Sequence, residues 1–591
     1  MVGSVHNQTA RLVTALPRSS WPPPARLRQR YAVLVDSLDD EHELSVVQGA
    51  LAAARELDAR VVVVPGGAVE APDARLSANN FAFDLVGPTS ALGALVLSSA
   101  LGNEIGPSKL AAWLTRFEGL PVCCMGVPIE GYASVRVDNA AGIRDVVCHL
   151  IEVHGKRNIG FIRGPQHSEE AEVRLAAYRQ ALEQHGITPD PRWIVDGDYN
   201  RPSGAQAIRT ILDQRRVSVQ ALDALVCAND YMALGALEEL GRRGINVPEQ
   251  VALSGFDDVD SARESRPTLT TVRQPGTELG REGLKQLVLL TTGAHLGGDR
   301  VLPVELKLRR SCGCTSLDVT LLERVQTTGT PSSFEVSLIQ RRQLIIAELA
   351  RAAHGSFGAG GADWESALLG ALLEEIRESK PGALSRRVQR LLQKMEHANG
   401  DLSAVPQVLA TLRRHALPCV ARDGKERDSL EDAISDAQLI TTGMLTQATR
   451  SSMRAELRRT RVLAREIQEQ MFDKPVAVSR VLAEHLPALG VDACVVAALA
   501  PNERGHVGEV CLGFGAGKGH PDTEAVALSR LVEHPLVEQG RTLFLLPIAL
   551  GSEPLGVAAF SVTTQLARGE LLEDLRELLA PVLKVMQRRH V

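Results

Sequence analysis

Short apolar runs alternate with segments of helical periodicity through the first half of the chain. The run 31–35 (YAVLV) is typical of a strand that a parallel sheet buries on both faces. Apolar residues recur at helical spacing over 44–57, and a second apolar run at 61–64 ends at Pro65. This order predicts a strand–helix–strand unit with a right-handed crossover.

The alternation continues to about residue 255 and predicts an α/β architecture with mainly parallel strands. The predicted strands are too many for one sheet, so we expect two. The remaining predicted strands lie at 94–98, 121–125, 158–163, 192–195, 223–227 and 250–255. The remaining predicted helices lie at 108–117, 140–154, 170–185, 203–213 and 231–243.

The pattern changes twice in the second half of the chain. From about residue 317, long helical patterns rich in Ala, Leu, Arg, Glu and Gln replace the short apolar runs. Near Pro475 short strand patterns return, and a helix at 569–588 follows them, which predicts a small α+β domain. The helical patterns lie at 334–353, 364–378, 384–397 and 428–471, and the later strand patterns at 492–499, 508–514, 542–549 and 554–562.

The helix pattern before Pro475 carries an apolar stripe at near-heptad spacing. Such a stripe either pairs two chains in parallel or packs against its own domain, and both interpretations stay open. Its members are Met453, Leu457, Thr460, Leu463, Ile467 and Met471.

Composition indicates a folded protein of several domains. The chain has 591 residues, 44% hydrophobic and 23% charged, which is ordinary for globular proteins. The 65 Lys and Arg against 71 Asp and Glu give a net charge of -6, so no general basic field points to nucleic acid. The nine cysteines are odd in number and scattered, as in a reducing compartment. With no apolar signal segment or membrane span in view, we expect a cytoplasmic protein without a membrane partner.

Polar residues cluster where the predicted strands end, which is where open α/β sheets bind ligands. An arginine, an amide, carboxylates and an aromatic ring suit a polyhydroxylated or amino-bearing small molecule. We see neither a nucleophile nor a metal cage among them, so no catalytic residue and no cofactor is predicted. The candidate ligand-binding residues are Asp36, Ser37, Arg174, Tyr199, Asn229 and Asp257.

Five local strings occur in the order found in one protein family. They are RLAAY (174–178), GDYNRPSG (197–204), CANDYMALGAL (227–237), ALSGFDDVD (252–260) and PTLTTVRQP (267–275). Through them, residues 31–316 resemble the effector-binding domain of the lactose/galactose repressor family, which has a two-lobed, periplasmic-binding-protein-like fold.

The resemblance assigns roles to single residues. It implies that Arg174, Tyr199, Asn229 and Asp257 contact the ligand, whereas Asp230 caps the following helix. The family frequently has Asp after the fourth strand of the first lobe. Gly126 takes that place here, so one hydroxyl contact is in doubt.

Each candidate also has a purely structural interpretation. Asp257 and Asp258 suit a turn, and Asn229 with Asp230 suits an Asx turn and helix cap. Arg174 would then be a surface residue paired with Glu170, four positions earlier. We favour the ligand site because the residues occur as a set in the family's order.

The string RRSCGC at 309–314 resembles the end of the repressor-like sensor domain in bacterial hybrid signalling proteins. Cys312 and Cys314 alone make a poor metal site, because no further close Cys or His ligand is evident, so no metal is expected. Residues 476–591 resemble a GAF-type sensory domain in pattern more than in motif.

Four segments follow: a disordered Pro/Arg-rich tail (1–30), the effector-binding domain (31–316), a helical transmitter region (317–475) and a GAF-like domain (476–591). The tail contains Pro17 and three prolines at 22–24, so we expect no helix-turn-helix in it and no direct DNA binding. Signatures of cyclases, histidine kinases and nucleotide-binding output domains were not found.

The sequence thus predicts a non-catalytic cytoplasmic sensor that binds a sugar-like or other polar metabolite between two lobes and relays its state through helices. A homodimer and a downstream signalling protein are the expected partners. The alternative is a transcriptional regulator of the lactose/galactose repressor family without its own helix-turn-helix. Ligand, downstream partner and sign of regulation stay open.

Overall fold

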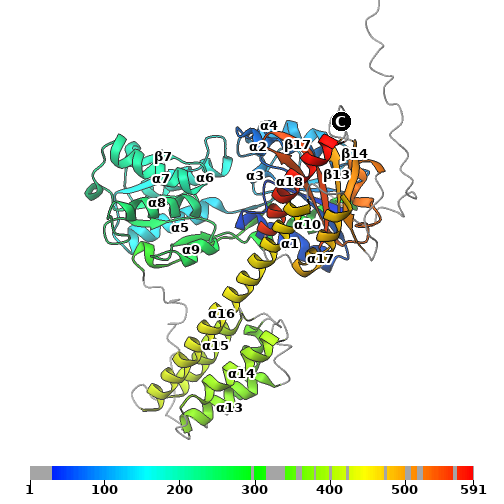
Figure 1. Ribbon diagram of the computed structural model, residues 1–591. Helices are drawn as coiled ribbons and strands as arrows, with labels where there is room; N and C mark the ends of the chain where they lie inside the picture. Colours follow the sequence, from blue (N-terminus) through cyan, green and yellow to red (C-terminus); the bar gives the residue numbers. More distant parts are fainter. Residues whose placement is uncertain are drawn as a thin grey trace, which may run out of the picture. The chain divides into compact units, whose positions relative to one another are not determined.

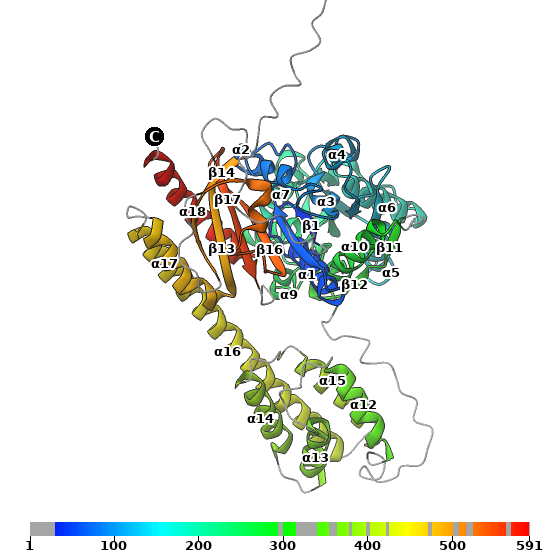
Figure 2. The same ribbon diagram turned by 90° about the vertical axis from the view of Figure 1, so that its right-hand side faces the viewer.

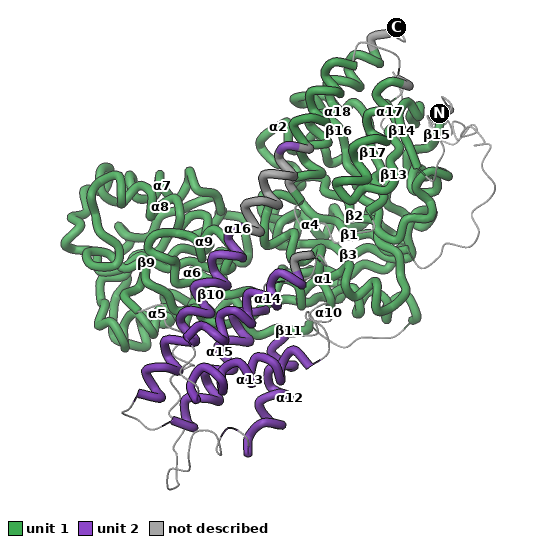
Figure 3. Tube along the Cα trace, turned by 60° about the horizontal axis from the view of Figure 1, so that its bottom comes forward, with its two compact units in different colours: residues 1–316, 460–591 green, residues 317–459 purple. Residues whose placement is uncertain are grey.

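The computed structural model describes the chain in several stretches (Figure 1). These are residues 30–293, 299–314, 338, 340–353, 363–377, 381–397, 402, 404–420, 425–470, 475–499, 507–515, 524–562 and 569–589. Two compact units result, residues 1–316 with 460–591 and residues 317–459 (Figure 3). No helix within the described stretches is both long and apolar enough to cross a bilayer.

The first lobe is built on a parallel sheet in the order β11-β5-β4-β3-β1-β2. Alternate residues of β1 enter opposite cores, Val33 beneath α1 and α10 and Leu34 beneath α4. Each face is therefore apolar and covered, as the run 31–35 predicts. The strands are β1 (Arg30–Val35), β2 (Arg60–Pro65), β3 (Ala94–Leu97), β4 (Val122–Met125), β5 (Ala133–Val137) and β11 (Arg300–Leu302). The helices are α1 (Glu41–Glu56), α2 (Ala74–Ser77), α3 (Ser98–Leu101), α4 (Gly106–Leu114) and α10 (Gly276–Thr291).

The second lobe has its own parallel sheet in the order β7-β6-β8-β9 and its own core. The predicted two-lobed α/β architecture with parallel sheets is confirmed. The strands are β6 (Ile159–Arg163), β7 (Ile194–Asp196), β8 (Ala224–Cys227) and β9 (Ala252–Ser254). The helices are α5 (Asn139–Glu152), α6 (Glu169–Gln184), α7 (Arg201–Arg209), α8 (Asp230–Arg242) and α9 (Asp260–Glu264).

The chain passes between the lobes three times. It leaves β5 for α5, returns from β10 (Thr271–Arg273) to α10, and passes again from β11 to β12 (Glu305–Lys307). The antiparallel pair β10–β12 joins the last two passages. β5, α10 and the β10–β12 pair were not predicted from the sequence, because their apolar runs are short or interrupted by polar residues.

The C-terminal strands do not form a separate sheet but extend the sheet of the first lobe (Figure 2). β16 pairs in parallel with β2, with Phe544 opposite Val63, to give eleven strands in all. The strands are β13 (Val491–Leu499), β14 (Val507–Phe514), β15 (Glu524–Ala527), β16 (Thr542–Leu550) and β17 (Glu553–Val562), with helices α17 (Pro475–His485) and α18 (Glu570–Arg589). The sequence did not reveal this junction, and the GAF-like character of 476–591 stays a prediction.

The second unit is helical and has a core of its own. It contains α12 (Arg342–Ala352), α13 (Trp364–Arg377), α14 (Ala383–His397), α15 (Val405–Ala416) and the first part of α16 (Lys425–Gln470). Because α16 is continuous across residue 459, it is the last helix of this unit and also belongs to the first. The boundaries predicted at 317 and 475 thus bracket the helical unit and the end of α16.

The apolar stripe on α16 packs within the chain where its side chains are described. Leu463 and Ile467 are buried in the same core cluster as Leu579 and Val582 of α18. This favours packing against its own domain over pairing of two chains. The side chains of Met453, Leu457 and Met471 lie outside the described residues.

The shared sheet predicts that the first lobe and the C-terminal strands lose stability together. Phe544→Ala should lower the free energy of unfolding by about 3–5 kcal/mol, because Phe544 is 1% exposed in the core that crosses the junction. Hydrogen exchange of the β2 amides should accelerate along with that of β16. Leu550→Ala, at the 46% exposed end of the same strand, is the control and should change stability by no more than about 0.5 kcal/mol. Unchanged protection of β2 in Phe544→Ala would show that the junction does not couple them.

Candidate functional site

All six predicted ligand-binding residues line one cavity of about 580 Å³. Asp36 and Ser37 follow β1 in the first lobe, and the other four belong to the second lobe. The structure therefore brings together residues that are separated by more than 200 positions. Their contact with a ligand stays a prediction.

Arg174 is held from three sides in α6. Its Nε donates to Asn139 Oδ1 at 2.8 Å and one terminal nitrogen donates to the Ala228 carbonyl at 2.7 Å. The guanidinium lies 4.0 Å over the Phe256 ring. With 2% of its surface exposed, Arg174 is not the surface residue of the alternative interpretation.

The second terminal nitrogen of Arg174, Nη2, is buried and has no hydrogen-bond acceptor among the described residues. It lies 3.5 Å from Glu170 Oε2, an ion pair but not a good hydrogen bond. A buried donor without an acceptor is costly. An oxygen atom of a ligand in the cavity would satisfy it.

Tyr199 has a left-handed backbone, φ 52°, in the loop after β7. Its ring packs on Gly164, where a Cβ would lie 2.4 Å from the ring, so only glycine fits. Its hydroxyl is 3.3 Å from Ser168 Oγ. Burial raises the pKa of Tyr199 to about 12, so the hydroxyl stays protonated.

The cap of α8 differs from the expectation. Asn229, not Asp230, is the N-cap, and its Oδ1 accepts from the Met232 amide at 2.9 Å. Asp230 instead accepts from Thr271 Oγ1 at 2.6 Å and from the Val259 amide at 3.1 Å. The carboxylate is turned toward β10 because it is the nearest buried acceptor for these two donors. Asn229 therefore caps α8, as its structural interpretation predicts, and it also lines the cavity.

Asp257 follows β9 with a strained φ of 117°. Its Oδ1 accepts from Gln274 Nε2 at 2.6 Å. Burial raises the pKa of Asp257 to about 6, although Arg174, His42 and Gln274 act against the rise. This carboxyl group therefore changes protonation close to neutral pH.

Asp258, the adjacent residue, has a structural role. Its buried carboxylate pairs with Arg263, Arg273 and Arg309. Their hydrogen bonds lower the pKa of Asp258 despite its burial. Both residues have the positive φ of a turn, but only the Asp258 carboxylate is taken up by three arginines.

In the first lobe, the loop after β1 is fixed by Glu43 of α1. The Glu43 carboxylate accepts from the amides of Asp36 at 2.9 Å and Ser37 at 3.2 Å. Burial raises the pKa of Asp36 to about 6, and Asp40 and Glu104 add to the rise. Asp36 and Asp257 thus face the same cavity with similarly weakened acidity.

The cavity is rich in carboxyl groups and has few cations. Only Arg174 and His42 among its lining residues carry or can acquire a positive charge. Such a wall suits a ligand that donates hydrogen bonds, from hydroxyl or amino groups. The lining carboxyl groups belong to Asp36, Asp40, Glu43, Asp73, Glu104, Glu170, Asp198 and Asp257.

His42 and Gln274 line the cavity but were not predicted, because neither follows a predicted strand. His42 lies at the start of α1, and Gln274 lies where the chain crosses from β10 to α10. Gly126, which replaces the family's Asp, has φ 90°, and a Cβ there would lie 2.3 Å from Ser99 Oγ. Ser99 lines the cavity, so its hydroxyl lies close to the position of the carboxylate that the family resemblance implies at residue 126.

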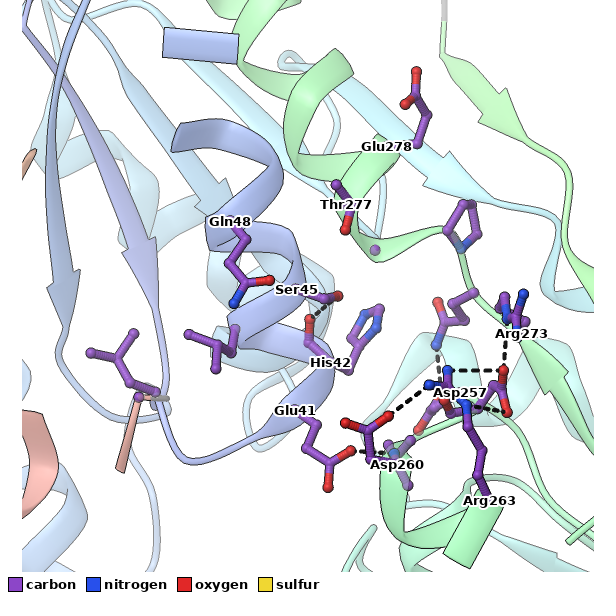
Figure 4. A pocket seen from close by; sticks show the side chains of 18 of the residues that line it. Glu41, His42, Ser45, Gln48, Asp257, Asp260, Arg263, Arg273, Thr277 and Glu278 are labelled. Carbon is purple, nitrogen blue, oxygen red and sulfur yellow. Dashed lines mark hydrogen bonds and ion pairs between the residues drawn. The ribbon is translucent and has the colours of Figure 1, made fainter. Parts of the chain in front are cut away.

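A second cavity of about 640 Å³ lies on the other side of His42, Asp257 and Gln274, which line both cavities (Figure 4). Figure 4 shows Glu41 and Ser45 of α1 facing Arg263 and Arg273 of the second lobe. The Asp260 amide donates to Glu41 Oε2 at 2.5 Å, which ties the lobes together at this cavity.

Comparison with known proteins supports a sensor domain of the lactose/galactose repressor type. Residues 147–312 match the periplasmic binding protein-like domain model. The repressor CytR of Escherichia coli K12 is 38% identical over 179 residues, which are 30% of this chain and 51% of CytR. The regulator CelR of Thermobifida fusca is 38% identical over 188 residues, which are 32% of this chain and 54% of CelR. A solved structure of a CelR–cellobiose complex has 29% identity and a TM-score of 0.42, and covers 48% of this chain and 84% of that one. The chain thus spans about half the length of these curated relatives. They are named as transcriptional regulators.

The weakened acidity of Asp257 predicts a pH-dependent stability difference. In the ligand-free protein the folded state prefers the protonated carboxyl group, so ionisation at pH 8 destabilises the fold. The penalty begins to fade as pH falls through about 6 and is gone only below the ordinary Asp pKa of 3.8. Asp257→Asn should therefore melt about 2–4 °C above the wild type at pH 8, and the gap should narrow below pH 6 and close near pH 4. Scanning fluorimetry between these pH values measures it. The exposed Asp145→Asn should show no such gap, and a constant gap for Asp257→Asn would contradict the assignment.

Proposed function

We propose that this chain is a transcriptional regulator whose residues 31–316 bind a small polar effector between the two lobes. One observation supports this most directly: Arg174, whose buried Nη2 has no hydrogen-bond acceptor among the described residues, lines a cavity together with carboxyl groups of both lobes. The similarity to regulators such as CytR and CelR supports the transcriptional output.

The effector is a sugar-like or amino-bearing metabolite. Asp36, Asp257 and Glu170 accept hydrogen bonds from its hydroxyl or amino groups, and Arg174 donates to one of its oxygen atoms. The Tyr199 ring covers an apolar face of the molecule. Asp36 belongs to the first lobe, whereas the other contacting residues belong to the second. The effector therefore stabilises the state in which the lobes are closed.

The chain connectivity offers a route from the lobes to the helices. The second lobe is followed by residue 317 of the helical unit, whereas the end of that unit, α16, continues into the core of the first lobe's sheet. A change in lobe separation then moves the two ends of the helical unit relative to one another. The same connectivity would also suit a second function, relay to a downstream signalling protein.

Effector binding should depend on Asp257 and Arg174. A thermal-shift screen of sugars, nucleosides and amino-bearing metabolites on the full chain should find a ligand that stabilises by about 2.7 kcal/mol at 100 times its dissociation constant. Asp257→Asn and Arg174→Met should each weaken that ligand about 10–100-fold in calorimetry, because hydrogen bonds to charged groups contribute about 1.5–3 kcal/mol. Asp145→Asn, outside the cavity, is the matched control. Equal affinities in all four proteins would contradict the site.

The transcriptional output is tested in cells. Deleting the gene and introducing Asp257→Asn should change the transcripts of an overlapping set of genes, because the deletion abolishes the effector response and the substitution weakens it. The purified chain alone is expected to leave no footprint on DNA upstream of those genes at physiological salt. Unchanged transcripts would favour the signalling relay, and a clear footprint would show that the chain reads DNA itself. Residues 1–29 lie outside the described part, so their predicted disorder is untested.

A further inference from the structure

Two histidines and two cysteines from distant parts of the second lobe converge on one point. His149 lies in the last turn of α5 and His154 just beyond it, while Cys312 and Cys314 lie at the end of the sensor domain. Their four ligand atoms are all within 4.8 Å of one another. None of these residues lines the effector cavity.

The separations fit the edges of a tetrahedron around zinc. Bonds of about 2.3 Å to sulfur and about 2.0–2.1 Å to nitrogen place two nitrogens about 3.3 Å apart and a nitrogen and a sulfur about 3.6 Å apart. His149 Nε2 is 3.2 Å from His154 Nε2 and 3.7 Å from Cys312 Sγ. Cys314 Sγ is 3.4 Å from Nε2 of His149 and 3.4 Å from Nε2 of His154.

Hydrogen bonds do not explain this convergence. His149 Nε2 alone has three neighbours in the group, yet a ring nitrogen has only one proton or one lone pair to offer. A metal ion at the centre of the group would accept a lone pair from each ring nitrogen, which is how neutral imidazole binds metals.

The backbone around Cys312 and Cys314 is fixed so that both thiols reach the histidines. Ser311 Oγ donates to the Leu253 carbonyl at 2.6 Å, which anchors this turn to β9. Gly313 has φ 105°, and a Cβ there would lie 3.3 Å from the His154 ring, so the turn needs glycine to approach this closely. Thr270 Oγ1 is 3.1 Å from Cys312 Sγ, a contact that would orient a metal-binding thiolate.

We propose that His149, His154, Cys312 and Cys314 bind one Zn²⁺ ion in a closed, structural site. Two imidazoles and two thiolates in tetrahedral array favour zinc over metals that prefer oxygen or square-planar ligands. The sequence-based expectation of no metal rested on Cys312 and Cys314 having no further ligands nearby, whereas α5 supplies His149 and the turn after it supplies His154. The ion ties the end of the sensor domain to α5 and so fixes the place from which the chain leaves the second lobe.

A neighbouring group serves as an internal comparison. Cys148, Glu152 and His185 also lie within reach of one another, but they number only three, and Glu152 is exposed and already paired with His185 at 3.0 Å. Cys148 is adjacent to His149 in sequence and is partly buried, which makes Cys148→Ser the matched control.

The test measures the metal in the full chain purified without chelator. Elemental analysis should find one zinc per chain in the wild type and in Cys148→Ser. Cys314→Ser and His154→Ala should bind zinc at least about 10-fold more weakly in competition with a chromophoric chelator, since even residues outside the ligand set cost about 10–100-fold. Circular dichroism checks that the variants fold.

A second measurement needs no variant. Zinc should protect Cys312 and Cys314, but not Cys148, from alkylation, as read by mass spectrometry, and cobalt in its place should give the visible bands of a tetrahedral thiolate site. A wild type that retains no zinc after exposure to excess metal and desalting would overturn the proposal. So would equal zinc content in wild type and ligand variants, or a disulfide between Cys312 and Cys314.

Discussion

The parallel pairing of β2 with β16 is the constraint on which the arrangement of the larger unit depends. β2 would otherwise be an open edge whose residues 61–64 are all apolar, a surface that favours aggregation. β16 satisfies its backbone groups, and the core clusters on both faces run across the junction. The first lobe is therefore one body with the C-terminal strands, and any movement on effector binding is a movement of the second lobe against that body.

The parts predicted correctly from sequence are those that depend on local order. The period of apolar residues identified β1, β2 and most helices, because burial of a strand on two faces or of a helix on one leaves its mark within a few residues. The places of Asp36 and Asp257 were also predictable, since each follows a parallel strand of its own sheet. That they meet Arg174 of α6 in one cavity was expected only from the resemblance to a two-lobed fold.

The failures share another physical cause. β16 meets β2 across more than 470 positions, and His149 meets Cys312 across 163, so no spacing rule links them.

The cap of α8 is a failure of a different kind. Asn229 and Asp230 are both good caps, and only the tertiary donors Thr271 and Val259 decide which residue turns inward.

The carboxyl groups of the cavity lower the stability of the empty protein and are also the groups proposed to bind the effector. Burial of Asp36 and Asp257 weakens the acidity of both groups, which means that the empty protein holds their charges at a cost. Donors on an effector would supply what the protein lacks, and most fully when the lobes are closed. Under the proposed function, the preference for the closed state would arise from the same carboxyl groups that select the ligand.

Under the proposed function, two covalent connections link the lobes to the helical unit. One connection is rigid, since α16 continues from the helical unit into the core where Leu463 and Ile467 pack. The other leaves the second lobe after Cys314, where a short turn would be free to yield if only hydrogen bonds such as that of Ser311 fixed it. The proposed metal bonds at Cys312 and Cys314 would remove that freedom. The proposed relay would then start from two connections of different lobes, one held by a metal and one by a continuous helix.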